Sequence, residues 1–386
     1  MNTIQLDGDA ADRFTPLADE FRSLLRAHGE TGAAIAVYQG GERVVDMYGS
    51  HGSTQGEWHA DDRVCTMSAC KGPLALCVHL LHERGALSLD DPVAQYWPAF
   101  DNNGKGAITV AMLLNHTSGL PIVREVSYGN VFSWSTMCEA LAATSPEFPP
   151  GERLVYHAIT FGHLVGELIR RVDGRMPSVF FDEEIAQPLG IEYALRFRSS
   201  DRIRAIAPNA RYSGLPLWLY SRVFSLLPSW KMQFFKPCST AYHPNSAQWA
   251  RSEVPAVTGQ GSARGLAKFY AFLAGDGRLA GDTLCSPSTV AQLRQCSVEA
   301  LEASSGLPWR MGAGFMLNSP EFCSFGPNPN SFGHMGMGGA AGFADPDAAL
   351  SFAYVTEQYH HPNKHDKSVS GQRLQRLVEA LYRCRL

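Results

Sequence analysis

Apolar residues recur along the chain at two different spacings, and each spacing predicts one kind of element. Helical spacing predicts helices over residues 16–28, 68–85, 263–274 and 369–383. Short runs rich in β-branched, aromatic and small apolar residues predict strands over residues 32–38, 43–48, 311–317, 334–336 and 349–357. Between residues 87 and 255 the pattern is mostly helix and loop, with frequent Pro and Gly and no internal repeat.

The order of these elements predicts an α+β fold. A helix and two strands come first, and three strands and a helix come last, so both chain ends are expected to meet in one antiparallel sheet covered by helices. Residues 1–86 and 256–386 then form one lobe, and residues 87–255 form a mostly helical second lobe. A catalytic site is expected between the two lobes.

Composition excludes several classes of protein. The chain has 386 residues, of which 45% are apolar and 18% charged, which is typical of a globular protein with a substantial core. The net charge of −4, without a basic block, argues against nucleic-acid binding. No apolar run approaches the ~20 residues that a membrane-spanning helix needs. Oligomeric state is left open.

The N-terminal segment and the cysteines indicate a cytoplasmic protein. Residues 1–14 are polar and acidic, with no signal-peptide pattern. The 9 cysteines are scattered without a C-x-x-C pair, so reduced thiols are the simpler interpretation. No Gly-rich phosphate loop follows a strand, and no cofactor or metal is implied.

Ser68 and Lys71 form an S-x-x-K motif at the start of a predicted helix. Because these two residues are three positions apart on a helical turn, the hydroxyl and the amine lie on the same face of that turn. A serine is a weak nucleophile until a base removes its proton, and a lysine is such a base only when its pKa is lowered. Pro73 is tolerated only in a first helical turn, so either the regular helix begins near Ser68 or Ser68 lies on a 3₁₀ turn.

Three further segments accompany this motif. They read LLNHTSGLP (residues 113–121), PPGERLVYHAITFGHLVGELIRRVDG (149–174) and FGHMGMGGAAGFADP (332–346). Together with the S-x-x-K motif they resemble the serine β-lactamase and penicillin-binding-protein superfamily. Within it the chain is most similar to the class C β-lactamase-like esterases, or family VIII carboxylesterases, over residues 32–357.

The resemblance implies a role for each matching catalytic residue. Ser68 matches the nucleophile that becomes acylated, and Lys71 matches the lysine that shares or relays its proton. Tyr156, five residues after a Pro-Gly pair, matches the tyrosine that acts as general base, as a phenolate or through a relay.

The resemblance also implies an oxyanion hole and a substrate side of the site. The backbone N–H groups of Ser68 and Met337 match the oxyanion donors, which typically contribute ~3–4 kcal/mol each. His334 and Gly336 stand at the first and third positions of the β-lactamase Lys-Thr-Gly motif, and a substrate contact is expected there. His157 is a further candidate for substrate contact.

Two departures from the β-lactamase pattern favour esters. Ala158 replaces the Asn of the Tyr-x-Asn motif, and His334 replaces the Lys of Lys-Thr-Gly. Both changes remove groups that hold an anionic lactam. The resemblance therefore implies a carboxylesterase that acts on a small-molecule ester or thioester. The alternatives are an acyltransferase of the same fold, a β-lactamase or D-amino-acid peptidase, and a non-catalytic relative.

Other chemical groups have simpler interpretations. Ser118, in HTSG, is expected in a structural turn, and Cys70 is expected to be a small buried side chain. His360, His361 and His365 lie in a Pro- and Asn-rich segment with no metal-ligand spacing. The apolar segment 215–235 is expected to form either lobe core or a lid over the site.

Overall fold

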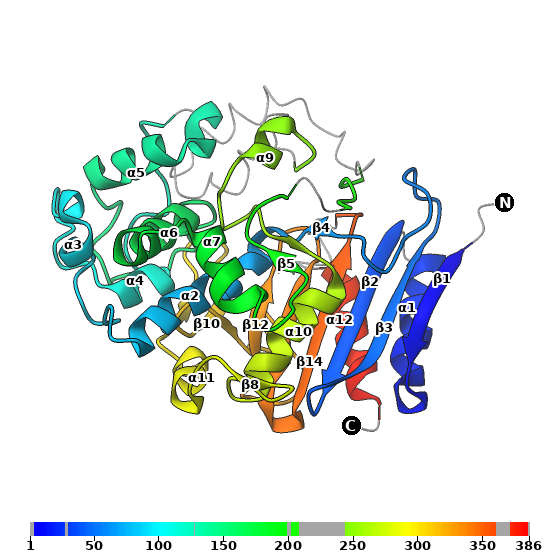
Figure 1. The fold of residues 1–386 in the computed structure, drawn as a ribbon. Coiled ribbons are helices and arrows are strands. Elements are labelled where there is room, and N and C mark those ends of the chain that lie inside the picture. The colour runs from blue at the N-terminus through cyan, green and yellow to red at the C-terminus, as the bar shows by residue number, and fades with distance from the viewer. Residues whose placement is uncertain are drawn as a thin grey trace.

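The structure, a computed structural model, describes residues 4–27, 30–126, 128–198, 202–207, 244–359 and 371–384. Its centre is a 9-stranded antiparallel sheet in the order β1-β3-β2-β14-β13-β12-β11-β10-β9, built from both chain ends as the sequence predicts (Figure 1). The strands are β1 (Gln5–Ala10), β2 (Gly32–Gln39), β3 (Glu42–Ser50), β4 (Val64–Cys65), β5 (Tyr193–Ala194), β6 (Gln260–Gly261), β7 (Arg278–Leu279), β8 (Asp282–Thr283), β9 (Val298–Leu301), β10 (Pro308–Met311), β11 (Met316–Leu317), β12 (Phe332–Met335), β13 (Ala341–Asp345) and β14 (Leu350–Thr356).

Helices cover both faces of the sheet. The described helices are α1 (Thr15–Ala27), α2 (Lys71–Glu83), α3 (Val93–Tyr96), α4 (Val110–Leu114), α5 (Trp134–Ala143), α6 (Thr160–Asp173), α7 (Pro177–Phe181), α9 (Ala247–Arg251), α10 (Ala263–Ala274), α11 (Pro287–Arg294) and α12 (Gly371–Tyr382). Helix α10 packs on β2, β13 and β14, whereas α1 and α12 pack together on the opposite face. Successive side chains of β2 alternate between the two resulting cores because a strand has a period of two.

The helical part lies to one side of the sheet, at the left in Figure 1. Its centre is α2, which is buried along nearly its whole length and packs against α6 and α7. A helix buried all round needs a mostly apolar sequence, and KGPLALCVHLL supplies one, with Lys71 and His79 as its buried polar side chains. The division of the chain into two lobes remains a prediction.

The beginning of α2 settles the open question about Pro73. A 3₁₀ turn, η2 (Met67–Cys70), precedes the helix, so Ser68 lies on the 3₁₀ turn and Pro73 falls in the first turn of α2. Proline costs little there because the first N–H groups of a helix have no partner within the helix.

Several strand predictions were wrong in detail. In the central sheet, strands β1, β9 and β13 were missed, as were the short strands β4 to β8 outside it, and the single strand expected over residues 311–317 is two strands, β10 and β11. The break occurs because Gly314, at a φ of 93°, passes directly over α2: a Cβ there would lie 2.2 Å from the Cβ of Ala75. Only glycine fits such a turn. The predicted segment 215–235 and the three histidines at 360, 361 and 365 lie outside the described residues.

Candidate functional site

Ser68 is presented by a strained turn between β4 and α2. Met67, immediately before it, has a left-handed φ of 49°, which is rare for a residue with a side chain and is common at functional sites. Thr66 anchors the turn, because its N–H donates to the carbonyl of Gly259 at 2.9 Å and its hydroxyl lies 2.5 Å from that of Tyr193. Ser68 itself retains 9% exposure.

Lys71 lies beneath Ser68 and is fully buried. Its Nζ is 3.1 Å from Ser68 Oγ, 3.0 Å from the carbonyl oxygen of Ala158 and 2.9 Å from that of Ala256. Burial without a carboxylate partner lowers the pKa of Lys71 from 10.5 to about 7. In the neutral amine, the two N–H bonds go to the two carbonyls, which can only accept, and the lone pair is directed at Ser68.

Tyr156 lies on the other side of Ser68, in the segment that precedes α6. Its phenol ring is buried, with Lys71 Nζ 4.9 Å from the ring centroid. Burial raises the pKa of Tyr156, and its hydrogen bond with Ser68 opposes that shift. The phenol is therefore protonated at neutral pH, and it shares Ser68 with the amine of Lys71.

Strand β12 brings Gly336 and Met337 against the Ser68 turn. A Cβ on Gly336 would lie 2.1 Å from the carbonyl oxygen of Thr66, so only glycine allows this approach. Within the described ranges, the N–H groups of Ser68 and Met337 donate to no backbone carbonyl. Two free N–H groups on adjoining segments are the arrangement that an oxyanion hole requires.

His334, two residues earlier on β12, is buried and neutral. Burial, reinforced by the nearby charge of Lys71, lowers the pKa of His334 to about 3. Its Nδ1 lies 2.7 Å from the carbonyl oxygen of Met335, which fixes the proton on Nδ1. Nε2 is then a hydrogen-bond acceptor, and it has no partner within the described part of the chain. The ring centroid lies 6.2 Å from that of Tyr156.

His157, predicted to contact substrate, directs both ring nitrogens at groups of the protein. Its Nδ1 lies 2.5 Å from the carbonyl oxygen of Val155, so Nδ1 carries the proton. Its Nε2 accepts from Ser118 Oγ at 2.9 Å and from the N–H of Leu120 at 3.2 Å. Both ring nitrogens are thus used inside the protein, and burial lowers the pKa of His157 to about 4. Through these bonds the ring joins the turn of residues 118–120 to the Tyr156 segment. Ser118 therefore lies in a structural turn, as the sequence predicts.

The site contains residues that the sequence did not single out. His116, at a φ of 65°, accepts the N–H of His157 on its Nδ1 and packs its ring 4.7 Å from that of Tyr156. Trp309 packs on the same phenol at 5.2 Å. Glu302 accepts the backbone N–H of Tyr156. His116 falls within a quoted motif, but no local signal marked Trp309 or Glu302.

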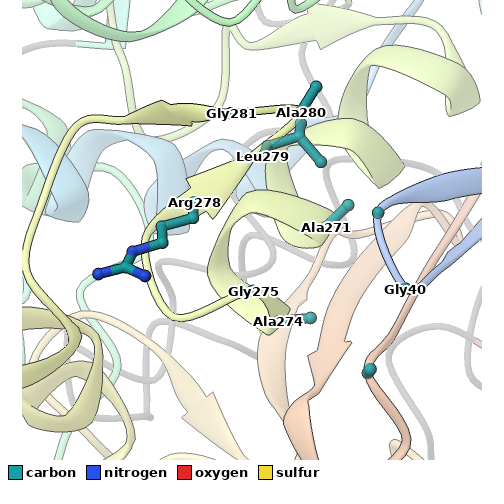
Figure 2. Close-up of a pocket in the computed structure, with 10 residues that line it drawn as sticks. Gly40, Ala271, Ala274, Gly275, Arg278, Leu279, Ala280 and Gly281 are labelled. Carbon is teal, nitrogen blue, oxygen red and sulfur yellow. The ribbon is translucent and has the colours of Figure 1, made fainter.

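Other groups carry no comparable chemistry. Cys70 is buried, as expected, with its pKa raised to about 11 by burial. No cluster of three potential metal ligands occurs in the described ranges. A cavity of about 260 Å³ between the β2–β3 hairpin and the end of α10 is lined mainly by Gly and Ala (Figure 2), toward the opposite end of β2 and β14 from the Ser68 site. No helix among the described residues is long and apolar enough to cross a membrane.

Comparison with known proteins agrees with this geometry. The Beta-lactamase family model matches residues 17–374. The Esterase/beta-lactamase LipL of Mycobacterium tuberculosis is 31% identical over 368 residues, which cover 92% of this chain and 83% of that protein. A crystal structure of a family VIII carboxylesterase has a TM-score of 0.86 at 33% identity, covering 98% of this chain and 100% of the other. A penicillin-binding protein homolog from Caulobacter crescentus has the same TM-score at 31% identity, covering 98% and 99%.

Proposed function

The chain belongs to the β-lactamase family, and on that premise we propose that it is a serine hydrolase that cleaves carboxylic esters through an acyl intermediate on Ser68. One observation carries the proposal: Lys71 Nζ lies 3.1 Å from Ser68 Oγ while two backbone carbonyls occupy its N–H bonds. The esterases similar to this chain support the ester as substrate.

Acylation begins with proton transfer from Ser68 to the neutral amine of Lys71. With a pKa of about 7, the amine is present in quantity at neutral pH and is still basic enough to accept the proton. The oxygen of Ser68 attacks the ester carbonyl, and the N–H groups of Ser68 and Met337 bind the oxyanion. The strained turn at Met67 holds Ser68 in place for this attack.

Tyr156 completes the proton path. Its phenol is protonated at neutral pH and hydrogen-bonded to Ser68, so it can give a proton to the departing alkoxide and recover one from Lys71. The alcohol then leaves, and water attacks the acyl-enzyme by the reverse path. The steps use only groups of this chain and water.

A neutral substrate fits the site better than an anionic one. His334 is uncharged and offers Nε2 as an acceptor, which suits a hydroxyl or N–H group on the substrate. We therefore propose that His334 contacts substrate and that Gly336 shapes the site by its close approach to Thr66. His157 is proposed to position Tyr156 rather than to bind substrate.

Location in the cytoplasm is a further part of the proposal. The eight described cysteines are free thiols, and seven of them are buried. Free thiols persist most readily in a reducing compartment. Fractionation of the native host with an antibody to the protein tests this point.

The experiment compares hydrolysis of p-nitrophenyl butyrate by the wild type, Ser68→Ala and Lys71→Met. Both substitutions are expected to lower kcat by at least about 10³-fold, since they remove the nucleophile or its base. Ser351→Ala is the matched control, because it removes another buried serine hydroxyl, which donates to the carbonyl of Ala267 in α10, and it should retain ester hydrolysis. Retention of more than a few per cent of activity by Ser68→Ala would reject the proposal. An acyl ester formed with an added alcohol, in place of the free acid, would indicate acyl transfer.

A further inference from the structure

A buried carboxylate supports the backbone of Tyr156. Glu302 lies at the tip of the β9–β10 hairpin and is fully buried. Its Oε1 accepts the N–H of Tyr156 at 3.0 Å, and its Oε2 accepts the N–H of Ser305 at 2.7 Å. The hydroxyl of Ser304 lies 2.5 Å from Oε1 and 2.7 Å from Oε2. Both oxygens accept from N–H groups, which is the pattern of a carboxylate held by neutral donors.

The hairpin tip is itself fixed, so this support is rigid. The N–H of Glu302 donates to the carbonyl of Leu307 at 2.9 Å, and the N–H of Gly306 donates back to the carbonyl of Glu302 at 2.7 Å. A second bond joins the two segments directly, from the N–H of Ala303 to the carbonyl of Leu154 at 3.0 Å. The Tyr156 segment is thereby attached to the end of the central sheet.

Burying the carboxylate of Glu302 without a cation beside it costs free energy of folding. A buried charge is usually paired with a cation, whereas the hydrogen-bond partners of Glu302 described above are N–H and O–H groups. Its negative charge lies close enough to Tyr156 to raise the pKa of the phenol further, after burial. Glu302 therefore holds the backbone of Tyr156 and also favours the protonated phenol.

We propose that Glu302 is a positioning residue for Tyr156, which keeps the phenol aligned on Ser68 and able to protonate the leaving alcohol. This inference rests on the proposed function, since it assumes that Tyr156 transfers that proton. Loss of the carboxylate leaves a buried N–H of Tyr156 without an acceptor, and the segment then shifts. A displacement of about 1 Å at a reacting group can cost about 10²-fold in rate.

The choice of leaving group separates this role from a merely structural one. An alkoxide needs a proton as it departs, whereas p-nitrophenolate leaves readily without one. A misplaced Tyr156 therefore slows hydrolysis of an alkyl ester much more than that of a p-nitrophenyl ester with the same acyl group. Partial unfolding slows both esters equally.

The experiment is a double-mutant cycle that joins Glu302→Ala with Tyr156→Phe. Ethyl butyrate and p-nitrophenyl butyrate are the two substrates. Glu302→Ala is expected to lower kcat for ethyl butyrate about tenfold more than kcat for p-nitrophenyl butyrate, with KM unchanged. In the Tyr156→Phe background the same substitution should change the ratio of the two rates by less than about twofold.

Two further variants complete the design. Glu302→Gln keeps an oxygen for the N–H of Tyr156 but loses the charge, so its ratio of rates should fall between those of wild type and Glu302→Ala. If Glu302→Ala does not fold, Glu302→Gln still tests the inference. Glu299→Ala is the matched control, because Glu299 lies on the same hairpin with a side chain that is 65% exposed and paired with Arg310. It should leave both rates unchanged.

The outcomes distinguish the inference from the proposal beneath it. Equal loss on both esters in Glu302→Ala, or an equal effect in the Tyr156→Phe background, would overturn the positioning role. A ratio of rates in Glu302→Gln as low as that in Glu302→Ala would do the same, because the oxygen that Gln keeps should restore at least part of the alignment of Tyr156. If Tyr156→Phe itself leaves ethyl butyrate hydrolysis unchanged, the proposed function of Tyr156 is rejected instead.

Discussion

Loss of the buried amine in Lys71→Met should change how stability depends on pH. The folded protein holds Lys71 with a pKa of about 7, whereas the unfolded chain holds it near 10.5. Between these two values the unfolded chain binds more protons than the folded protein, so the contribution of Lys71 to stability rises with pH. Below about pH 7 both states are protonated, and the full destabilisation is present.

The size of the effect follows from the two pKa values. One pKa unit corresponds to about 1.4 kcal/mol, so the whole displacement of Lys71 corresponds to roughly 5 kcal/mol. Between about pH 7 and pH 9.5, wild type should gain about 3 kcal/mol in free energy of unfolding relative to Lys71→Met. Methionine has a similar length and cannot titrate, so other ionisable groups cancel in the difference.

Urea unfolding of both proteins at several pH values measures this difference. The kcat/KM of wild type for p-nitrophenyl butyrate should rise over the same range, with an apparent pKa near 7, as the neutral amine of Lys71 becomes available. A difference in unfolding free energy that does not vary with pH would show that Lys71 is not held with a lowered pKa. The proposed role of its lone pair would then be refuted.

Two further substitutions and one labelling experiment test other parts of the account. Gly336→Ala should lower kcat at least about tenfold, because its Cβ displaces the turn that carries Ser68. Its circular dichroism should match that of wild type, and full activity would contradict this packing. His157→Ala should lower the unfolding free energy by about 3 kcal/mol, because it removes a buried acceptor of two hydrogen bonds. KM should be unchanged, and a raised KM at unchanged stability would instead indicate that His157 contacts substrate. Iodoacetamide at pH 8 should label the exposed Cys296 and not the buried Cys70. Peptide mapping identifies the labelled cysteine, and an ester assay should show that the labelled protein keeps its activity.

The sequence predicted the parts of the site that depend on local geometry. The spacing of Ser68 and Lys71 follows from a single helical turn, and the structure keeps their polar atoms 3.1 Å apart. The 3₁₀ opening of α2 could be anticipated because Pro73 is excluded from a deeper turn. Tyr156 was found through the family resemblance, since its distance along the chain from Ser68 carries no geometric information.

Contacts between distant segments could not be predicted. Glu302 is 146 residues from Tyr156 along the chain, and an acidic residue in a Ser-Gly-rich turn resembles any solvent-exposed one. His157 was expected to reach substrate because it adjoins Tyr156, yet its orientation is fixed by Ser118 and Leu120 from another turn.

The missed strands have similar causes. Strand β1 (QLDGDA) has low β propensity and is held at the sheet edge by pairing with β3. Strand β13 (AGFAD) is rich in small residues because Gly342 lies against the ring of Tyr270. In both cases contacts with distant segments, rather than the local sequence, determine the strand.

Intact-protein mass spectrometry tests the central claim most directly. Wild type and Ser68→Ala are mixed briefly with p-nitrophenyl butyrate and quenched in acid. The account predicts a transient gain of one butyryl group on wild type and none on Ser68→Ala, with the modified peptide containing Ser68. An adduct of equal amount on Ser68→Ala, or rapid turnover with an adduct on another residue, would contradict it.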